Sequence, residues 1–196
     1  MGGDRRNPPG GSEDRDKVHI LEKALLRGHF LLTSGLHSEF YFEKFRILED
    51  PSLLRKFSRE LARAFRPLRP ERVAGPFTGG AILAYEVARV MGLRAAYAER
   101  GEGGRVFRRG FDLRGERVVV VDDVLTTGKS LRETVEAVER AGGVVVGVGV
   151  MVKRGDFSGE YPFHYVMELD LPAYPPSECP LCEAGIPLSV VGKGQH

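Results

Sequence analysis

The stretch VVVVDDVLTTGKS, residues Val118–Ser130, decides the fold. Its four consecutive valines predict a strand that is buried on both faces, as in a parallel sheet. A helix is expected to follow at 129–141, with one apolar face made of Leu131, Val135 and Val138. A polar turn therefore joins a buried strand to an amphipathic helix, which is where open α/β folds bind their ligands.

The residues of this turn indicate the chemistry of the ligand. Asp122 and Asp123 end the predicted strand, and Gly128 allows the chain to bend sharply and to approach an anion closely. The N-terminus of the following helix offers backbone N–H groups to a phosphate. Two carboxylates beside a phosphate site are explained if the ligand also carries hydroxyl groups or a metal ion. A phosphorylated sugar with a vicinal diol satisfies both conditions.

The same turn allows two other interpretations, helix capping without a ligand and a Walker A phosphate loop. Simple helix capping without a ligand needs one capping side chain, whereas this turn has two acids and two threonines. The end of the segment, GKS, also matches the end of a Walker A phosphate loop. That motif requires a glycine five residues before Gly128, where this chain has Asp123. The sequence therefore excludes an ATPase of that type.

The segment 118–130 resembles the phosphoribosyl-pyrophosphate (PRPP) signature of the type I phosphoribosyltransferases, with its hydrophobic run, two acids, aliphatic pair and Thr/Gly-rich turn. The resemblance implies that Asp122 and Asp123 hold the ribose 2′- and 3′-hydroxyls during catalysis. It also implies that the turn binds the 5′-phosphate, and that Thr126 reaches the base. The residues implied in this turn are Val124, Leu125, Thr126, Thr127, Gly128, Lys129 and Ser130.

A second Gly-rich turn, GPFTGG at 75–80, lies between a predicted strand at Arg72–Gly75 and a predicted helix at Ala81–Met91. Its glycines and the helix N-terminus behind them permit close approach to another anion. In type I phosphoribosyltransferases this position is the pyrophosphate-binding loop, so Thr78 and Gly79 are implied to contact pyrophosphate. Two separate anion sites suit a ligand that is phosphorylated at both ends.

The segment LLTSGLHSEFYF, Leu31–Phe42, resembles the N-terminal segment of orotate phosphoribosyltransferases, in which a Ser-Gly turn precedes paired aromatic side chains. By that resemblance Tyr41 and Phe42 contribute to a hood that stacks on the base. Arg154 follows a predicted buried strand at 144–152 and is implied to pair with the orotate carboxylate, which a guanidinium grips bidentately. The alternatives are an ordinary core role for the aromatics and a solvated surface role for the arginine.

The region at 99–110 corresponds to a mobile loop that, in the family, closes a basic residue over the departing pyrophosphate. The family commonly uses lysine there, whereas this region contains only arginines: Arg100, Arg105, Arg108 and Arg109. Arg100 aligns best with the family lysine and is the predicted catalytic cation, and Arg105 is a predicted substrate-binding residue. Arginine stays charged at any working pH, so it stabilises an anion but is a poor proton donor. A solvated basic loop is the alternative.

Composition sets wider bounds. The 196 residues, 42% hydrophobic and 29% charged, with a net charge of +2, fit one globular domain and give no reason to propose nucleic acid as a partner. No apolar run reaches about 18 residues, so no membrane span is expected. The polar segment 1–16 lacks the apolar core of a signal peptide and is predicted to be a disordered tail. A single cytoplasmic domain at 17–196 is expected.

The chain has two cysteines, in the pattern CPLC at Cys179–Cys182. A single CxxC supplies at most half of a zinc site. Three interpretations stay open: a local turn with free thiols in a reducing compartment, a metal shared across a dimer axis, and a disulfide. None of them gives the cysteines a catalytic role.

Together these resemblances imply an α/β protein with the type I phosphoribosyltransferase fold: a doubly wound, mainly parallel sheet flanked by helices. A small hood is expected from about 17–45 plus the C-terminal segment. The implied reaction converts orotate and PRPP to orotidine 5′-monophosphate (OMP) and pyrophosphate, with Mg²⁺ held through PRPP and water. A homodimer is expected, with the loop reaching across the interface. The rival interpretations are a purine phosphoribosyltransferase and a non-catalytic PRPP-binding or nucleotide-binding regulator on the same fold.

Overall fold

A computed structural model of the chain describes residues 19–32 and 34–191. The chain divides into two compact units. The terminal unit comprises Met1–Glu43 and Pro172–His196, and the central unit comprises Lys44–Leu171. The tail expected at 1–16 lies outside the described residues.

The central unit is built on a six-stranded sheet with the order β5-β4-β3-β6-β7-β8. All neighbouring strands of this sheet pair in parallel except β5, which pairs antiparallel with β4. The mainly parallel α/β sheet predicted from the sequence is confirmed. The strand bounds are Arg72–Pro76 (β3), Arg94–Gly101 (β4), Gly104–Phe107 (β5), Arg117–Leu125 (β6), Val144–Lys153 (β7) and Phe163–Glu168 (β8).

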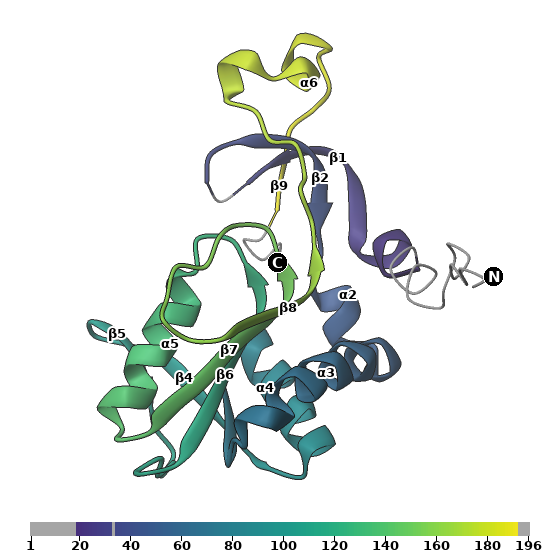
Figure 1. Ribbon diagram of the computed structural model, residues 1–196. Helices are drawn as coiled ribbons and strands as arrows, with labels where there is room; N and C mark the ends of the chain where they lie inside the picture. Colours follow the sequence, from purple (N-terminus) through teal and green to yellow (C-terminus); the bar gives the residue numbers. More distant parts are fainter. Residues whose placement is uncertain (1–18, 33, 192–196) are drawn as a thin grey trace, which may run out of the picture. The chain divides into compact units, whose positions relative to one another are not determined.

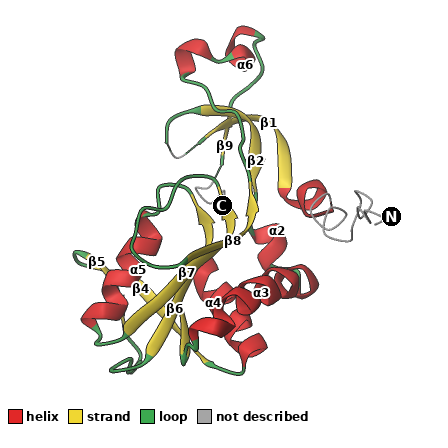
Figure 2. Ribbon diagram, viewed as in Figure 1, coloured by secondary structure: helices red, strands yellow, loops and turns green. Residues whose placement is uncertain are grey.

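Helices cover both faces of this sheet. In Figure 1, α3 (Pro51–Phe65) and α4 (Gly79–Met91) lie on one face and α5 (Lys129–Arg140) lies on the other. Figure 2 shows the same arrangement by secondary structure, with the strands between the two helical layers. The short elements α2 (Phe45–Leu48) and η1 (Arg66–Leu68) flank α3. This layering agrees with the doubly wound architecture that the family resemblance implied.

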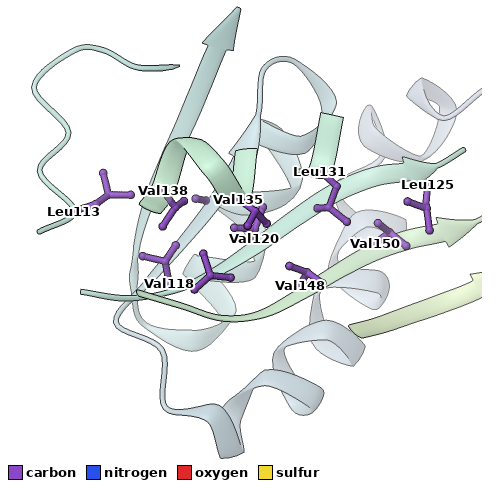
Figure 3. Close-up of a cluster of buried hydrophobic side chains, with 11 residues drawn as sticks. Leu113, Val118, Val120, Leu125, Leu131, Val135, Val138, Val148 and Val150 are labelled. Carbon is purple, nitrogen blue, oxygen red and sulfur yellow. The ribbon is translucent and has the colours of Figure 1, made fainter. Parts of the chain in front are cut away.

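The valine run of β6 is the centre of the core. Val118 and Val120 pack with the apolar face of α5 (Figure 3), and Val119 and Val121 point to the opposite face because side chains alternate along a strand. All four are fully buried. The predicted apolar face of α5 is buried as well, through Leu131, Val135 and Val138. The strand is therefore covered on both faces, as its composition predicted.

Two elements of the central unit are longer than expected. Strand β6 continues through both acids to Leu125 instead of ending before them. The region expected as a mobile loop at 99–110 forms a hairpin, because β4 extends to Gly101 and pairs with β5. Gly103, with a φ of +77°, supplies the turn between them. Alternating burial along β4, with Ala96 and Ala98 inside, explains why the strand persists.

The terminal unit contains a three-stranded sheet with the order β2-β1-β9. Its strands are β1 (Leu25–Leu31), β2 (His37–Phe42) and β9 (Ser189–Val190), and its short helical turns are η2 (Pro176–Glu178) and α6 (Pro180–Glu183). The hairpin between β1 and β2 turns at Gly35, as predicted. Residues 19–24 are helical, and the helix ends there because Leu25 onward pairs with β2.

Among the described residues, no helix combines the length and apolar character needed to cross a membrane.

Candidate active site

The acid pair lies near the end of β6 and is almost completely buried. Asp122 and Asp123 expose 7% and 3% of their surface. The Asp123 Oδ2 atom forms an ion pair with Lys44 Nζ at 2.6 Å, and its Oδ1 accepts a hydrogen bond from the Val124 N–H at 2.7 Å. The Asp123 N–H donates to Asp122 Oδ1 at 2.8 Å. The pair is thus held in place by the backbone and one lysine.

The pKa of the Asp122 carboxyl is raised above its ordinary value. Burial is the main cause that raises the pKa of Asp122 to about 7, and the adjacent charge of Asp123 adds to it. Lys44 and Ser130 act in the opposite direction but do not offset it. A ligand that brings hydroxyl donors or positive charge to Asp122 therefore favours the ionised form, so that ligand binding and proton release are linked.

The second Gly-rich turn packs directly against the acid pair. A Cβ placed on Gly79 would lie 1.8 Å from Asp123 Oδ2, and one on Gly80 would lie 3.0 Å from Asp122 Oδ1. A Cβ on Gly75 would meet the Gly80 carbonyl oxygen at 2.1 Å. The glycines at these positions are therefore required by close packing. The structure brings together the two motifs that the sequence analysis singled out separately.

Helices α4 and α5, which begin at the two Gly-rich turns, differ from α3 in how their N-termini are capped. Helix α3 is capped by Asp50, whose Oδ1 accepts from Ser52 N at 2.9 Å and Leu53 N at 3.2 Å. No side chain caps α4 at Thr78 or α5 at Gly128. The first N–H groups of a helix have no intrahelical partner, so these two N-termini are suited to bind anions. Neither acid caps α5, but Thr127 Oγ1, one residue before Gly128, accepts a hydrogen bond from the Lys129 N–H at 3.4 Å.

A cavity of about 330 Å³ opens beside the turn that follows β6. Asp122 and every residue of 124–130 line it, together with Arg100 and Arg105 from the β4–β5 hairpin. Asp122 and the residues of 124–130 therefore surround one space, whereas Asp123 is not among the residues that line it. Thr78 and Gly79 are not among the residues that line this cavity, but Gly79 lies against the acid pair at its edge.

Arg105 is the best anchored of the four hairpin arginines. It is 5% exposed, its Nη2 donates to Ser130 Oγ at 2.7 Å, and its Nη1 donates to the carbonyl oxygens of Phe77 and Ala98 at 3.3 and 3.2 Å. Its Nε atom is buried without a hydrogen-bond partner. Burial lowers the pKa of Arg105, although a guanidinium remains charged at neutral pH. Arg105 thus ties the second Gly-rich turn to the start of α5.

The other basic residues divide into two groups. Arg100 lines the cavity, as a residue that contacts a ligand should. Arg108 and Arg109 are exposed and pair with Glu99, at 3.5 and 3.2 Å. Sequence analysis missed Lys44, the cation that contacts Asp123. Its only signal in the sequence is its position two residues after the aromatic pair, which does not reveal a partner 79 residues away.

The residues predicted to bind the base are distributed over both units. Arg154 follows β7, and its backbone N–H donates to the Leu125 carbonyl at 2.8 Å, which places it at the same end of the sheet as the phosphate turn. It is not among the residues that line the 330 Å³ cavity. Tyr41 and Phe42 belong to the terminal unit. Phe42 is 5% exposed and is part of the core of that unit, whereas Tyr41 is half-buried and its ring lies 5.8 Å from that of Phe30.

Comparison with known proteins identifies the family to which this chain belongs. Residues 47–167 match the phosphoribosyl transferase domain family, so the fold and site define a phosphoribosyltransferase. The orotate phosphoribosyltransferase of Caldanaerobacter subterraneus subsp. tengcongensis is 47% identical over 181 residues, covering 89% of this chain and 95% of that protein. That of Thermus thermophilus is 40% identical over 172 residues, covering 86% and 94%. The chain belongs to the orotate phosphoribosyltransferase family.

Solved structures agree with this placement. Orotate phosphoribosyltransferase from Aeropyrum pernix superposes with a TM-score of 0.68 at 31% identity, covering 79% of this chain and 93% of that one. The Mycobacterium tuberculosis enzyme in complex with PRPP has a TM-score of 0.66 at 23% identity, covering 80% and 96%, and this likeness supports the fold. The type I phosphoribosyltransferase fold predicted from the sequence is confirmed.

Proposed function

We propose that this protein transfers a phosphoribosyl group from PRPP to orotate, forming OMP and pyrophosphate in de novo pyrimidine biosynthesis. The observation that carries the proposal is the buried acid pair: Asp122 lines a cavity of about 330 Å³ together with the start of α5, and Asp123 packs against Gly79 at the start of α4. The relatives named orotate phosphoribosyltransferase, which match most of the chain, support the choice of orotate.

Each group of residues has a proposed role. Asp122 and Asp123 accept hydrogen bonds from the ribose 2′- and 3′-hydroxyls, with Lys44 orienting Asp123 through the ion pair at its Oδ2 atom. The residues of 124–130 bind the 5′-phosphate with backbone N–H groups and hydroxyls, as the lining of the cavity supports. Thr78 and Gly79, at the start of α4, bind the pyrophosphate. No side chain forms a covalent intermediate: the C1–pyrophosphate bond breaks as orotate nitrogen bonds to C1, so catalysis consists of positioning and charge stabilisation.

The cations complete this charge stabilisation. Arg100 lines the cavity and is proposed to stabilise the departing pyrophosphate, while Arg105 positions the second Gly-rich turn and the start of α5. Mg²⁺ is proposed to bind through PRPP oxygens and water, neutralising charge on the leaving group. The structure fits this mode better than direct ligation by the pair, because Lys44 and the Val124 N–H already engage the Asp123 oxygens.

Tyr41, Phe42 and Arg154 are proposed to recognise the base, with Arg154 binding the orotate carboxylate. Its place after β7, beside the end of β6, supports this role. The burial of Phe42 indicates that it acts by holding Tyr41 and the surrounding strand, while Tyr41 is the more accessible ring.

We also propose that both units act as one cytoplasmic domain and that the protein is a homodimer with the tip of the β4–β5 hairpin reaching across the interface. Three large apolar side chains of α4 and its preceding turn are exposed, which supports a protein interface there: Phe77, Ile82 and Tyr85.

A substrate panel tests the proposal. Pyrophosphate release from PRPP and Mg²⁺ is measured with orotate, uracil, adenine and hypoxanthine as the acceptor base. We expect turnover with orotate and none with the purines. Turnover of a purine but not of orotate contradicts the proposal in favour of a purine enzyme, and tight PRPP binding without turnover of any base indicates a regulator.

A further inference from the structure

The terminal unit contains a second cluster of polar side chains, which the proposed reaction does not use. His29 lies on β1, His37 begins β2, and Cys179 and Cys182 flank the start of α6. Their ligand atoms all lie within 4.8 Å of one another. Figure 1 shows the segment that carries α6 beside β1 and β2. Residues about 150 positions apart in the sequence thus converge on one point.

Three of the four distances below lie within the range expected for a tetrahedral metal site, and the distance between the two histidine nitrogens is shorter. His29 Nε2 lies 3.0 Å from His37 Nδ1 and 3.5 Å from Cys179 Sγ. Cys182 Sγ lies 3.8 Å from His29 Nε2 and 3.3 Å from His37 Nδ1. A tetrahedral zinc ion, with Zn–N bonds of about 2.0–2.1 Å and Zn–S bonds of about 2.3 Å, separates its ligand atoms by roughly 3.3–3.8 Å.

The orientation of His29 adds an independent observation. Its other ring nitrogen, Nδ1, lies 2.7 Å from the carbonyl oxygen of Ile186. A carbonyl oxygen can only accept, so Nδ1 carries the proton and Nε2 presents a lone pair to the centre of the cluster. A histidine that ligates a metal through one nitrogen typically donates its other N–H to such an oxygen. The ring is therefore held in the tautomer that a metal requires.

The backbone around the cluster is held by contacts that need no metal. His37 and Tyr174 exchange two backbone hydrogen bonds of 2.8 Å, and Ser38 Oγ donates to the Pro172 carbonyl at 2.7 Å. The Cys182 N–H donates to the Cys179 carbonyl at 3.1 Å, closing the turn that places both sulfur atoms on the same side. These contacts bring the CxxC turn to the histidine pair, so the ligands are positioned before an ion binds.

An ion-free cluster would be unfavourable for folding, because three of its four side chains are buried. His29, His37 and Cys179 expose 2%, 6% and 1% of their surface. Buried polar groups require partners, and here they have chiefly one another. The apolar core of the terminal unit is also small. Units with so little core commonly depend on a metal or a disulfide for stability.

We propose that His29, His37, Cys179 and Cys182 bind one zinc ion, which joins the C-terminal segment to the β1–β2 hairpin. Two nitrogen and two sulfur ligands in a tetrahedral arrangement favour zinc over magnesium or calcium. Four protein ligands leave no open position for substrate, so the ion is structural. The CxxC pair supplies half of the site and the histidine pair supplies the other half, within one chain.

Metal analysis of the full-length protein tests the proposal without any turnover assay, so its outcome is independent of the proposed function. We expect about one zinc per chain after purification without chelators, with no disulfide in a thiol titration of the denatured protein. Cys182→Ser should lose the zinc, whereas Glu183→Gln, at the exposed position next to it, should keep it. A disulfide, iron in place of zinc, or no zinc bound and none taken up on adding Zn²⁺ would overturn the proposal.

Cobalt substitution keeps the test decisive if the serine variant fails to fold. Wild-type protein in which Co²⁺ replaces zinc should show the intense visible bands of tetrahedral Co²⁺ and a near-ultraviolet charge-transfer band from two thiolates. Removing the metal from wild type with a chelator should lower the unfolding temperature, and added Zn²⁺ should restore it. Weak octahedral bands without a thiolate band would contradict the assigned ligands.

Discussion

Asp122 and Asp123 are buried, as are three of the four side chains of the His/Cys cluster, with Cys182 exposed, yet the two groups are organised in opposite ways. Asp122 and Asp123 are adjacent in sequence, and the cavity beside them is open to a ligand. The His/Cys cluster draws on segments at both ends of the chain and leaves no position for a further ligand. The buried charge of the acid pair is only partly offset by nearby groups, which suits a site that binds substrate. Four protein ligands around one ion would instead serve stability.

Replacing both acids should have the largest effect on substrate binding. Asp122→Asn with Asp123→Asn should reduce PRPP binding by roughly 10²- to 10⁴-fold, because hydrogen bonds to charged groups contribute roughly 1.5–3 kcal/mol each. Isothermal titration calorimetry with Mg²⁺ present measures the change. Asp112→Asn is the matched control, since Asp112 is exposed and pairs with Arg114. Unchanged PRPP binding in the double variant would remove the acid pair from the site.

The second prediction concerns pH and the ligand-free protein. The folded-state pKa of Asp122 is about 7, above its ordinary value of 3.8, so the folded form binds more protons between these values. The free energy of unfolding should therefore fall as pH rises from about 4 to about 7, by up to a few kcal/mol. Urea unfolding at pH 5 and pH 8 measures this change. Asp122→Asn should flatten the profile, and an equal slope in that variant would contradict the assignment.

The third prediction tests the close packing between the second Gly-rich turn and the acids. Gly79→Ala places a methyl group where Asp123 Oδ2 lies, so either the turn or the carboxylate must move. A displacement near 1 Å in an active site can cost about 10²-fold in rate, and we expect kcat/KM to fall by about that factor. Ala81→Ser, two residues further along α4, is the control. An active Gly79→Ala variant would show that the turn is adaptable.

The smallest effect is expected at the hairpin. Arg105→Lys keeps the charge but loses the fork that reaches Ser130, Phe77 and Ala98, so kcat/KM should fall about tenfold. Arg109→Lys should change little, because Arg109 is exposed and pairs with Glu99. Steady-state kinetics with PRPP as the varied substrate separates the two. Equal effects of both substitutions would show that the hairpin acts only through its charge.

Much of the central unit follows from local patterns. The valine run predicted a strand buried on both faces, and the two Gly-rich turns predicted anion sites at helix N-termini, because these features depend on residues close together in sequence. The loop at 99–110 was harder to predict. Its Gly and Arg content indicates flexibility, but pairing between β4 and β5 provides hydrogen bonds that composition does not reveal.

The sequence by itself determined the class of fold, the two Gly-rich turns and the acid pair, since each depends on a continuous segment. Only the tertiary structure decided which distant groups meet those segments: Lys44 on Asp123, Arg105 between two turns, and two histidines beside the CxxC pair. The physical reason is that contacts between distant residues are set by packing and strand pairing, which no local period encodes. Half of a zinc site is visible in CPLC, and the fold supplies the other half.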